Sequence, residues 1–180
     1  AMTYSGYYMR KYVEPSTVKY VGHDDNDLIM IRYAEVLLNY AEAKERLGQL
    51  TQDDLDKSIN LLRNRVGMVK MNLSSLPAGS DIRTEIQRER RIELFFEGHR
   101  YFDIIRWKQG ELLAQDLLGV NRRWLDQSRL TVNLDKDLTW VTKNGQKYLL
   151  IETGRTFNPD KHYLLPIPFK QIQLNPNLLP

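Results

Sequence analysis

The residues best suited to chemistry stand in one short stretch, Arg88–Arg100. Within it, Glu89 and Glu93 are four residues apart, so a helix would place them one turn apart on the same face. Two carboxylates in that arrangement, with His99 nearby, could act as a general acid and base. Their Cβ atoms would be about 5–6 Å apart, a spacing that could suit a retaining glycosidase. This is the catalytic hypothesis for the chain.

A structural interpretation of the same carboxylates has more support. On a helical wheel, Glu89 and Glu93 fall within the apolar stripe formed by Ile82, Ile86 and Ile92. A carboxylate on a buried face needs a positively charged partner, and structural ion networks perturb carboxylates as strongly as active sites do. We therefore predict no catalytic residue and a structural ion network. Its arginines are expected from the set Arg32, Arg63, Arg65 and Arg100.

Trp124 is the best candidate for contact with a sugar. Sugar recognition combines a flat aromatic face, on which the C–H face of the ring stacks, with planar hydrogen-bonding groups for the hydroxyls. Such groups surround Trp124 in the sequence: Asn121, Arg122, Arg123 and Asp126. The alternative, favoured by the weight of large aromatics in protein cores, is that Trp124 anchors a loop on the core.

The sequence offers no metal site and no sign of a cofactor. There is no cysteine, and His23, His99 and His162 lack the spacing of metal ligands. Lys and Arg exceed Asp and Glu by 26 to 23, so the net charge of +3 indicates no nucleic-acid partner. The apolar runs are shorter than the roughly 20 residues that a membrane-spanning helix needs.

The elements that position these residues are mostly helices. Apolar residues recur at helical spacing over 28–47, and Gly48 would end that helix. Thr51 begins a second helix with Asp54 as its capping partner, and Gly67 ends it. The short connection predicts an antiparallel helix pair. The spacing Leu-x3-Ala-x6-Gly of a tetratricopeptide (TPR) repeat is matched by Leu37, Ala41 and Gly48.

Beyond residue 80, helices give way to loops. Ser80 is expected to cap a long helix from Asp81 toward Trp107, interrupted near Gly98, with a shorter helix at 111–118. Asn144-Gly145 predicts a β-hairpin of strands near 138–143 and 146–152, with Trp140 in the core. The proline-rich tail is expected to be an extended strap without regular helix.

We therefore predict one mainly α region over residues 1–180. Its parts are an N-terminal segment (1–27), a TPR-like helix pair (28–67), a long and a short helix (80–118), and a region of loops, β-hairpin and strap (119–180).

Five sequence blocks, in one order, resemble the SusD/RagB family of outer-membrane lipoproteins. They are Gly6–Tyr12, Ile31–Ala43, Glu89–Leu94, Glu97–Lys108 and Tyr163–Leu178. The resemblance implies a SusD-like fold and a non-catalytic glycan- or nutrient-binding protein on the outer membrane, partnering a SusC-like TonB-dependent transporter. Its ligand would be an oligosaccharide or a peptide, with no cofactor.

Members of this family are normally much longer, so we expect the chain to be their C-terminal portion. The lipidated N-terminal cysteine of the family is absent from the sequence, so membrane attachment is expected only through an anchor outside it. The alternative function is a TPR-type module that binds a protein or peptide and no sugar. Replacement of a loop tryptophan would separate the two, since only the first function needs a sugar-stacking ring.

Overall fold

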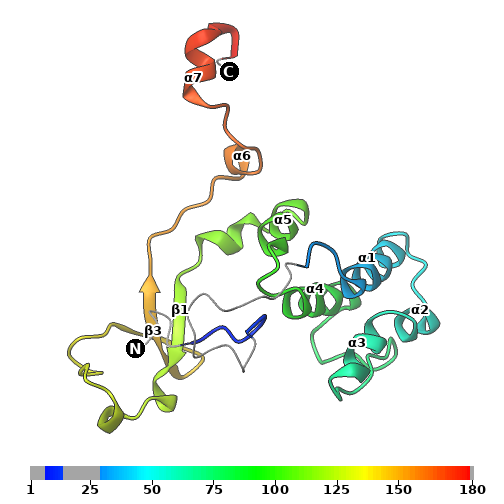
Figure 1. The fold of residues 1–180 in the computed structure, drawn as a ribbon, viewed down its shortest axis with the longest axis horizontal. Helices are drawn as coiled ribbons and strands as arrows, with labels where there is room; N and C mark the ends of the chain where they lie inside the picture. The colour runs from blue at the N-terminus through cyan, green and yellow to red at the C-terminus, as the bar shows by residue number, and fades with distance from the viewer. Residues whose placement is uncertain (1–6, 14–28, 179–180) are drawn as a thin grey trace. The chain divides into compact units, whose positions relative to one another are not determined.

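The computed structural model describes residues 7–13 and 29–178, and it is mainly helical with one small antiparallel sheet (Figure 1). The predicted fold class is thereby confirmed. The chain divides into two compact units, a helical unit within Lys11–Tyr101 and a sheet unit formed by the described residues 7–10 and 102–178. Of the predicted N-terminal segment, residues 1–6 and 14–27 lie outside the described residues, as does Leu28.

The first helix, α1, spans Tyr33–Arg46. It begins later than predicted, because the residues before it are not helical and Arg32 has an extended backbone (φ −130°, ψ 156°). It ends at Leu47, directly before Gly48, as predicted. Leu37, Leu38 and Ala41 are buried on its inner face.

The predicted second helix is divided into α2 (Gln52–Asp56) and α3 (Ile59–Arg65). The capping box at its start is confirmed: Thr51 Oγ1 accepts from the Asp54 N–H, and Asp54 Oδ2 accepts from the Thr51 N–H. The break follows from Ser58, whose Oγ donates to the Asp54 carbonyl at 2.5 Å and competes with the backbone for that acceptor. The prediction of a single helix over 51–67 was therefore wrong.

The helical unit has one apolar core. Helix α1 packs against α2, α3 and α4 (Ile82–Glu93), and Ala41, fully buried, lets the helices approach closely. The buried apolar residues of this core are Ala34, Leu37, Leu38, Ala41, Leu55, Ile59, Leu62, Met71, Ile86 and Leu94. No helix within the described ranges is both long and apolar enough to cross a bilayer.

The predicted long helix is interrupted, as expected near Gly98, into α4 and α5 (His99–Arg106). Phe96 and Gly98 both have positive φ (65° and 80°), which a right-handed helix does not accommodate. The cap of α4 differs from the prediction: Asp81, not Ser80, accepts the Thr84 N–H at 2.7 Å. Ser80 instead donates its hydroxyl to Glu85.

The sheet has three strands in the order β1-β3-β2: β1 (Leu117–Asn121), β2 (Trp140–Lys143) and β3 (Gln146–Glu152). The hairpin at Asn144-Gly145 is confirmed, with both residues at positive φ as a type I′ turn requires. Trp140 pairs with Leu149 in the predicted register. Trp140 itself is only partly buried.

Two predictions in this region were wrong. The short helix expected at 111–118 is a 3₁₀-helix, η1 (Gly110–Ala114), followed by β1, because Leu117 and Leu118 pair with β3 instead. The tail is not free of helix: it contains α6 (Pro159–His162) and α7 (Phe169–Leu174). Proline is tolerated there because Pro159 lies in the first turn of α6 and Pro168 directly precedes α7, where a backbone N–H is not needed.

Candidate functional sites

The carboxylates at the end of α4 meet arginines of the helix pair. Arg32 Nη1 lies 2.6 Å from Glu93 Oε1, and Arg32 Nε lies 2.7 Å from Glu97 Oε2. Arg65 reaches the other oxygen of Glu93 at 2.7 Å, and Lys11 forms an ion pair with Glu97. Of these five side chains, four are largely shielded from solvent, and Arg65 is about half exposed.

Contacts within this cluster shift the pKa of Glu97 and the pKa of Arg32. Burial alone would raise the pKa of Glu97, but hydrogen bonds from Arg32 and Lys11 outweigh burial and hold that pKa below its usual range. Hydrogen bonding to Glu97 correspondingly raises the pKa of Arg32. Sequence reasoning missed Glu97 and Lys11, because the two are 86 residues apart and no local pattern connects them.

Glu89, the other carboxylate of the catalytic hypothesis, also forms an ion pair with an arginine. Glu89 Oε2 accepts from Arg63 Nε at 2.9 Å and lies 2.8 Å from Arg63 Nη2. Glu89 and Glu93 are thus each held by guanidinium groups of the residues preceding α4. This arrangement favours a scaffold role, because charge-assisted hydrogen bonds to guanidinium groups hold each carboxylate in place between segments of the chain.

Arg100 lines a different feature, an open groove of about 770 Å³ with exposed aromatic rings on its wall. Phe95 and Phe96 are both more than half exposed, and their ring centroids lie 6.0 Å apart. The contribution of Arg100 to the ion network of Glu89 and Glu93 stays a prediction.

Trp124 lies in a 3₁₀-helix, η2 (Arg122–Trp124), directly after β1. Its side chain is 61% exposed, so within this chain it does not anchor the loop on a core. The guanidinium carbon of Arg123 lies 5.4 Å from the ring centroid, in reach of a cation–π contact. The sequence offered both possibilities for Trp124, and the structure places it at the surface.

The other residues predicted around Trp124 are divided between surface and interior. Asn121 is buried; its Oδ1 accepts from the Arg123 N–H, and its Nδ2 donates to Gln146 at 2.6 Å. Arg122 lies over the ring of Trp140, 5.7 Å from its centroid. Asp126 is exposed, and hydrogen bonds from Ser128 lower its pKa. Trp124, Arg123 and Asp126 are therefore the exposed members of the set.

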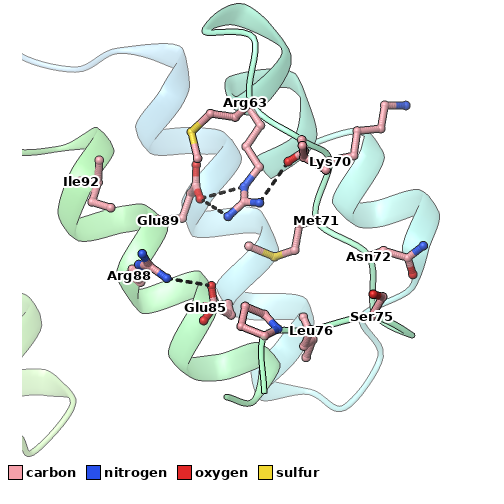
Figure 2. Close-up of a pocket in the computed structure, with 13 residues that line it drawn as sticks. Arg63, Lys70, Met71, Asn72, Ser75, Leu76, Glu85, Arg88, Glu89 and Ile92 are labelled. Atoms are coloured by element: carbon pink, nitrogen blue, oxygen red, sulfur yellow. Dashed lines mark hydrogen bonds and ion pairs between the residues drawn. The ribbon is translucent and has the colours of Figure 1, made fainter. Parts of the chain in front are cut away.

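A pocket that the sequence did not predict lies between α4 and the loop 68–77 (Figure 2). Its volume is about 490 Å³. Glu85, Arg88 and Glu89 line it from α4, and Arg63 closes one end by reaching Glu89 (Figure 2). Sequence patterns missed it because the loop is held over the helices by contacts distant in sequence, such as the Asn60 side chain, which donates to the Met71 carbonyl and accepts the Met71 N–H.

Metal ligation finds no support in the part of the chain that the structure describes, since no three His, Asp or Glu residues there are grouped to hold an ion.

Comparison with known proteins identifies the family. The profile of the SusD family matches residues 1–179, and the chain belongs to this family. It is 29% identical over 157 residues to SusD-like protein P2 of Formosa agariphila, covering 84% of the chain and 25% of that protein.

Similarity to solved structures supports the same family. The chain is similar to a SusD-like carbohydrate binding protein of Bacteroides fragilis, with 34% identity and a TM-score of 0.66, over 82% of the chain and 28% of that protein. A second SusD-like protein of the same organism is 31% identical, with a TM-score of 0.54, over 81% of the chain and 24% of that protein. The chain thus spans about a quarter of the length of these relatives.

Proposed function

We propose that the chain is part of a non-catalytic, glycan- or nutrient-binding component of a TonB-dependent uptake system, displayed on the surface of the outer membrane. The observation that carries this proposal is the similarity to a SusD-like carbohydrate binding protein, at 34% identity over 82% of the chain. Family membership over residues 1–179 supports the same function.

The arrangement of side chains supports binding over catalysis. The two carboxylates that could have formed an acid/base pair, Glu89 and Glu93, are held by Arg63, Arg32 and Arg65. Trp124, in contrast, presents an exposed ring beside Arg123, whose guanidinium can donate hydrogen bonds to hydroxyls. We propose that Trp124 stacks on the ligand, with Arg123 and Asp126 binding its hydroxyl groups.

The test is isothermal titration calorimetry of the full-length protein that contains this chain, against a panel of soluble oligosaccharides. We expect at least one to bind, and Trp124→Ala to weaken that binding by about tenfold or more, as loss of an aromatic stacking contact would. Phe169→Ala is the matched control, because Phe169 is also an exposed aromatic residue and is not among the residues proposed to contact the ligand. A panel without any binder would overturn the function, and equal affinity of Trp124→Ala and wild type would overturn the role of Trp124.

The transporter partnership has its own test. Purification of the full-length protein from its native membrane should retain a TonB-dependent transporter of SusC type. Recovery of the protein from the outer membrane without any transporter would contradict the partnership and leave the binding function standing.

A second candidate function is a protein- or peptide-interaction module of TPR type, favoured by the exposed groove at Phe95 and Phe96. An array of glycans that stays blank, together with a peptide that binds wild type but not Phe95→Ala, would support this function in place of the first.

A further inference from the structure

We infer that the pocket between α4 and the loop 68–77 is a subsite for a neutral sugar residue, distinct in its residues from the surface around Trp124. This inference rests on the proposed glycan-binding function and adds a second place of contact. With about 490 Å³, the pocket falls within the range of about 300–1,000 Å³ that small-molecule sites occupy.

Two carboxylate oxygens in the pocket are left to accept hydrogen bonds. Glu89 uses Oε2 for both contacts with Arg63, and among the described residues nothing donates to its Oε1. Glu85 accepts the Ser80 hydroxyl on Oε1 at 2.7 Å, while its Oε2 has only a 3.8 Å contact with Arg88. Both residues are more than nine-tenths buried (4% and 9% exposed). Among the described residues no fully buried side-chain oxygen lacks a hydrogen-bond partner, so these two oxygens are open to solvent in the pocket.

Arg88 supplies donors beside these acceptors. Its side chain is 60% exposed, and within the described ranges its ion pair is the long contact with Glu85, one turn earlier on α4 (Figure 2). A guanidinium carries five N–H donors in a fixed plane, and a contact of 3.8 Å leaves them free for a ligand. The hydrogen-bond acceptors of Glu85 and Glu89 and the donors of Arg88 therefore alternate along one face of α4.

This alternation fits a sugar better than an ion. Each hydroxyl of a sugar both donates and accepts, so neighbouring hydroxyls can bridge a carboxylate and a guanidinium. An anionic ligand would face two carboxylates, and a cation would face Arg63 and Arg88. Apolar side chains complete the wall for the C–H face of the ring: Met71, Leu76, Pro77 and Ile92.

The experiment maps amide resonances of the ¹⁵N-labelled chain in ¹H–¹⁵N correlation spectra. The probes are methyl α-D-glucopyranoside, methyl β-D-galactopyranoside and methyl α-D-mannopyranoside, each titrated separately. We expect at least one to shift amides of residues 68–77 and 85–92 in a saturable way. Arg88→Ala should weaken that binding by about tenfold, as expected for loss of charged hydrogen bonds.

The matched control is Arg91→Ala, because Arg91 is also exposed on α4 but does not line the pocket. A second pair of variants fills the space without removing a contact: Ser75→Trp places an indole in the lining, and Ala78→Trp places it directly after the loop, outside the lining. We expect Ser75→Trp to abolish the shifts and Ala78→Trp to preserve them.

The shifts separate this inference from the proposed function. Saturable shifts at residues 121–126 with none at 68–92 would overturn the subsite and leave the proposed function standing. Shifts at 68–92 that respond equally to Arg88→Ala and Arg91→Ala would also overturn the subsite. The absence of saturable shifts anywhere, together with the absence of any binder in the calorimetric panel, would overturn both.

Discussion

In the helical unit the partly buried Arg32 and Arg63 meet carboxylates, whereas in the sheet unit Arg122 and Arg123 lie over aromatic rings. Arg32 and Arg63 are bound to glutamates at 2.6–2.9 Å. Arg122 and Arg123 lie over Trp140 and Trp124 at 5.4–5.7 Å from the ring centroids. A guanidinium that is paired with a shielded carboxylate stays in its ion pair. An exposed cation that lies over an aromatic ring can instead be displaced from the ring by a ligand.

This difference indicates that the arginines of the two units have different roles. In the helical unit, one apolar core and the ion pairs of Glu89 and Glu93 hold the helices together. The sheet unit has fewer buried residues and exposes Trp124 at the end of a strand. Substitutions can test each half of this comparison.

The largest effect is expected where a charge of the helical unit loses its partner. Glu93→Gln removes the negative charge that Arg32 and Arg65 share, and the Glu93 side chain is only 13% exposed. We expect the free energy of unfolding to fall by about 3 kcal/mol, since stranding a buried charge is costly. Urea denaturation measures it, with the exposed Glu152→Gln as control. An unchanged urea midpoint for Glu93→Gln would contradict the scaffold role of this cluster.

A smaller effect is expected from close packing in the sheet unit. A Cβ atom at Gly110 would lie 2.0 Å from Phe157 Cζ, so Gly110→Ala forces the ring to move. Overpacking of this kind costs about 2 kcal/mol, which urea denaturation would detect. In a Phe157→Ala background, the same substitution should cost much less. Equal costs in the two backgrounds would show that the ring is not what excludes a side chain at this position.

The smallest effect is expected in the pH dependence of the helical unit. The hydrogen bond from Tyr40, followed by those from Thr51, holds the pKa of Asp54 well below its usual range. Because the pKa is depressed in the folded state, Asp54 stabilises the fold above the unfolded-state pKa of about 3.9 and loses this effect as the pH falls through the folded-state pKa.

Tyr40→Phe removes the largest of these causes, so the pKa of Asp54 should rise toward its usual value. We expect the midpoint of acid unfolding, followed by circular dichroism, to move to higher pH. The control is Tyr33→Phe on the same helix, whose side chain is exposed. Coinciding acid transitions of the two variants would show that the Tyr40 hydroxyl does not hold the Asp54 carboxylate.

Local signals in the sequence predicted much of the fold. The capping box at Thr51, the stop at Gly48 and the turn at Asn144-Gly145 were recognisable because each depends on residues within a few positions of one another. The strand β1 was missed because Leu117 and Leu118 take their conformation from pairing with β3, more than thirty residues away. The break at Ser58 was missed because a single serine hydroxyl decides it.

The candidate sites divide in the same way. The carboxylate spacing on α4 and the polar residues around Trp124 could be found, since each set is contiguous or one turn apart. The burial of Asn121 follows from the strand that was missed, and the pocket at Arg88 follows from a loop held by Asn60. The contacts that form these sites therefore join residues too far apart in the sequence for a periodic pattern to predict them.

The lengths of the helices carry one more consequence. Helix α1 has 14 residues, α4 has 12, α3 has 7 and α2 has 5, and the interruption at Phe96 keeps α4 from continuing into a longer helix. Helices shorter than about 12–15 residues are marginal in water on their own. The segments of the helical unit therefore gain their order from one another, and we expect them to form and melt together in one cooperative transition.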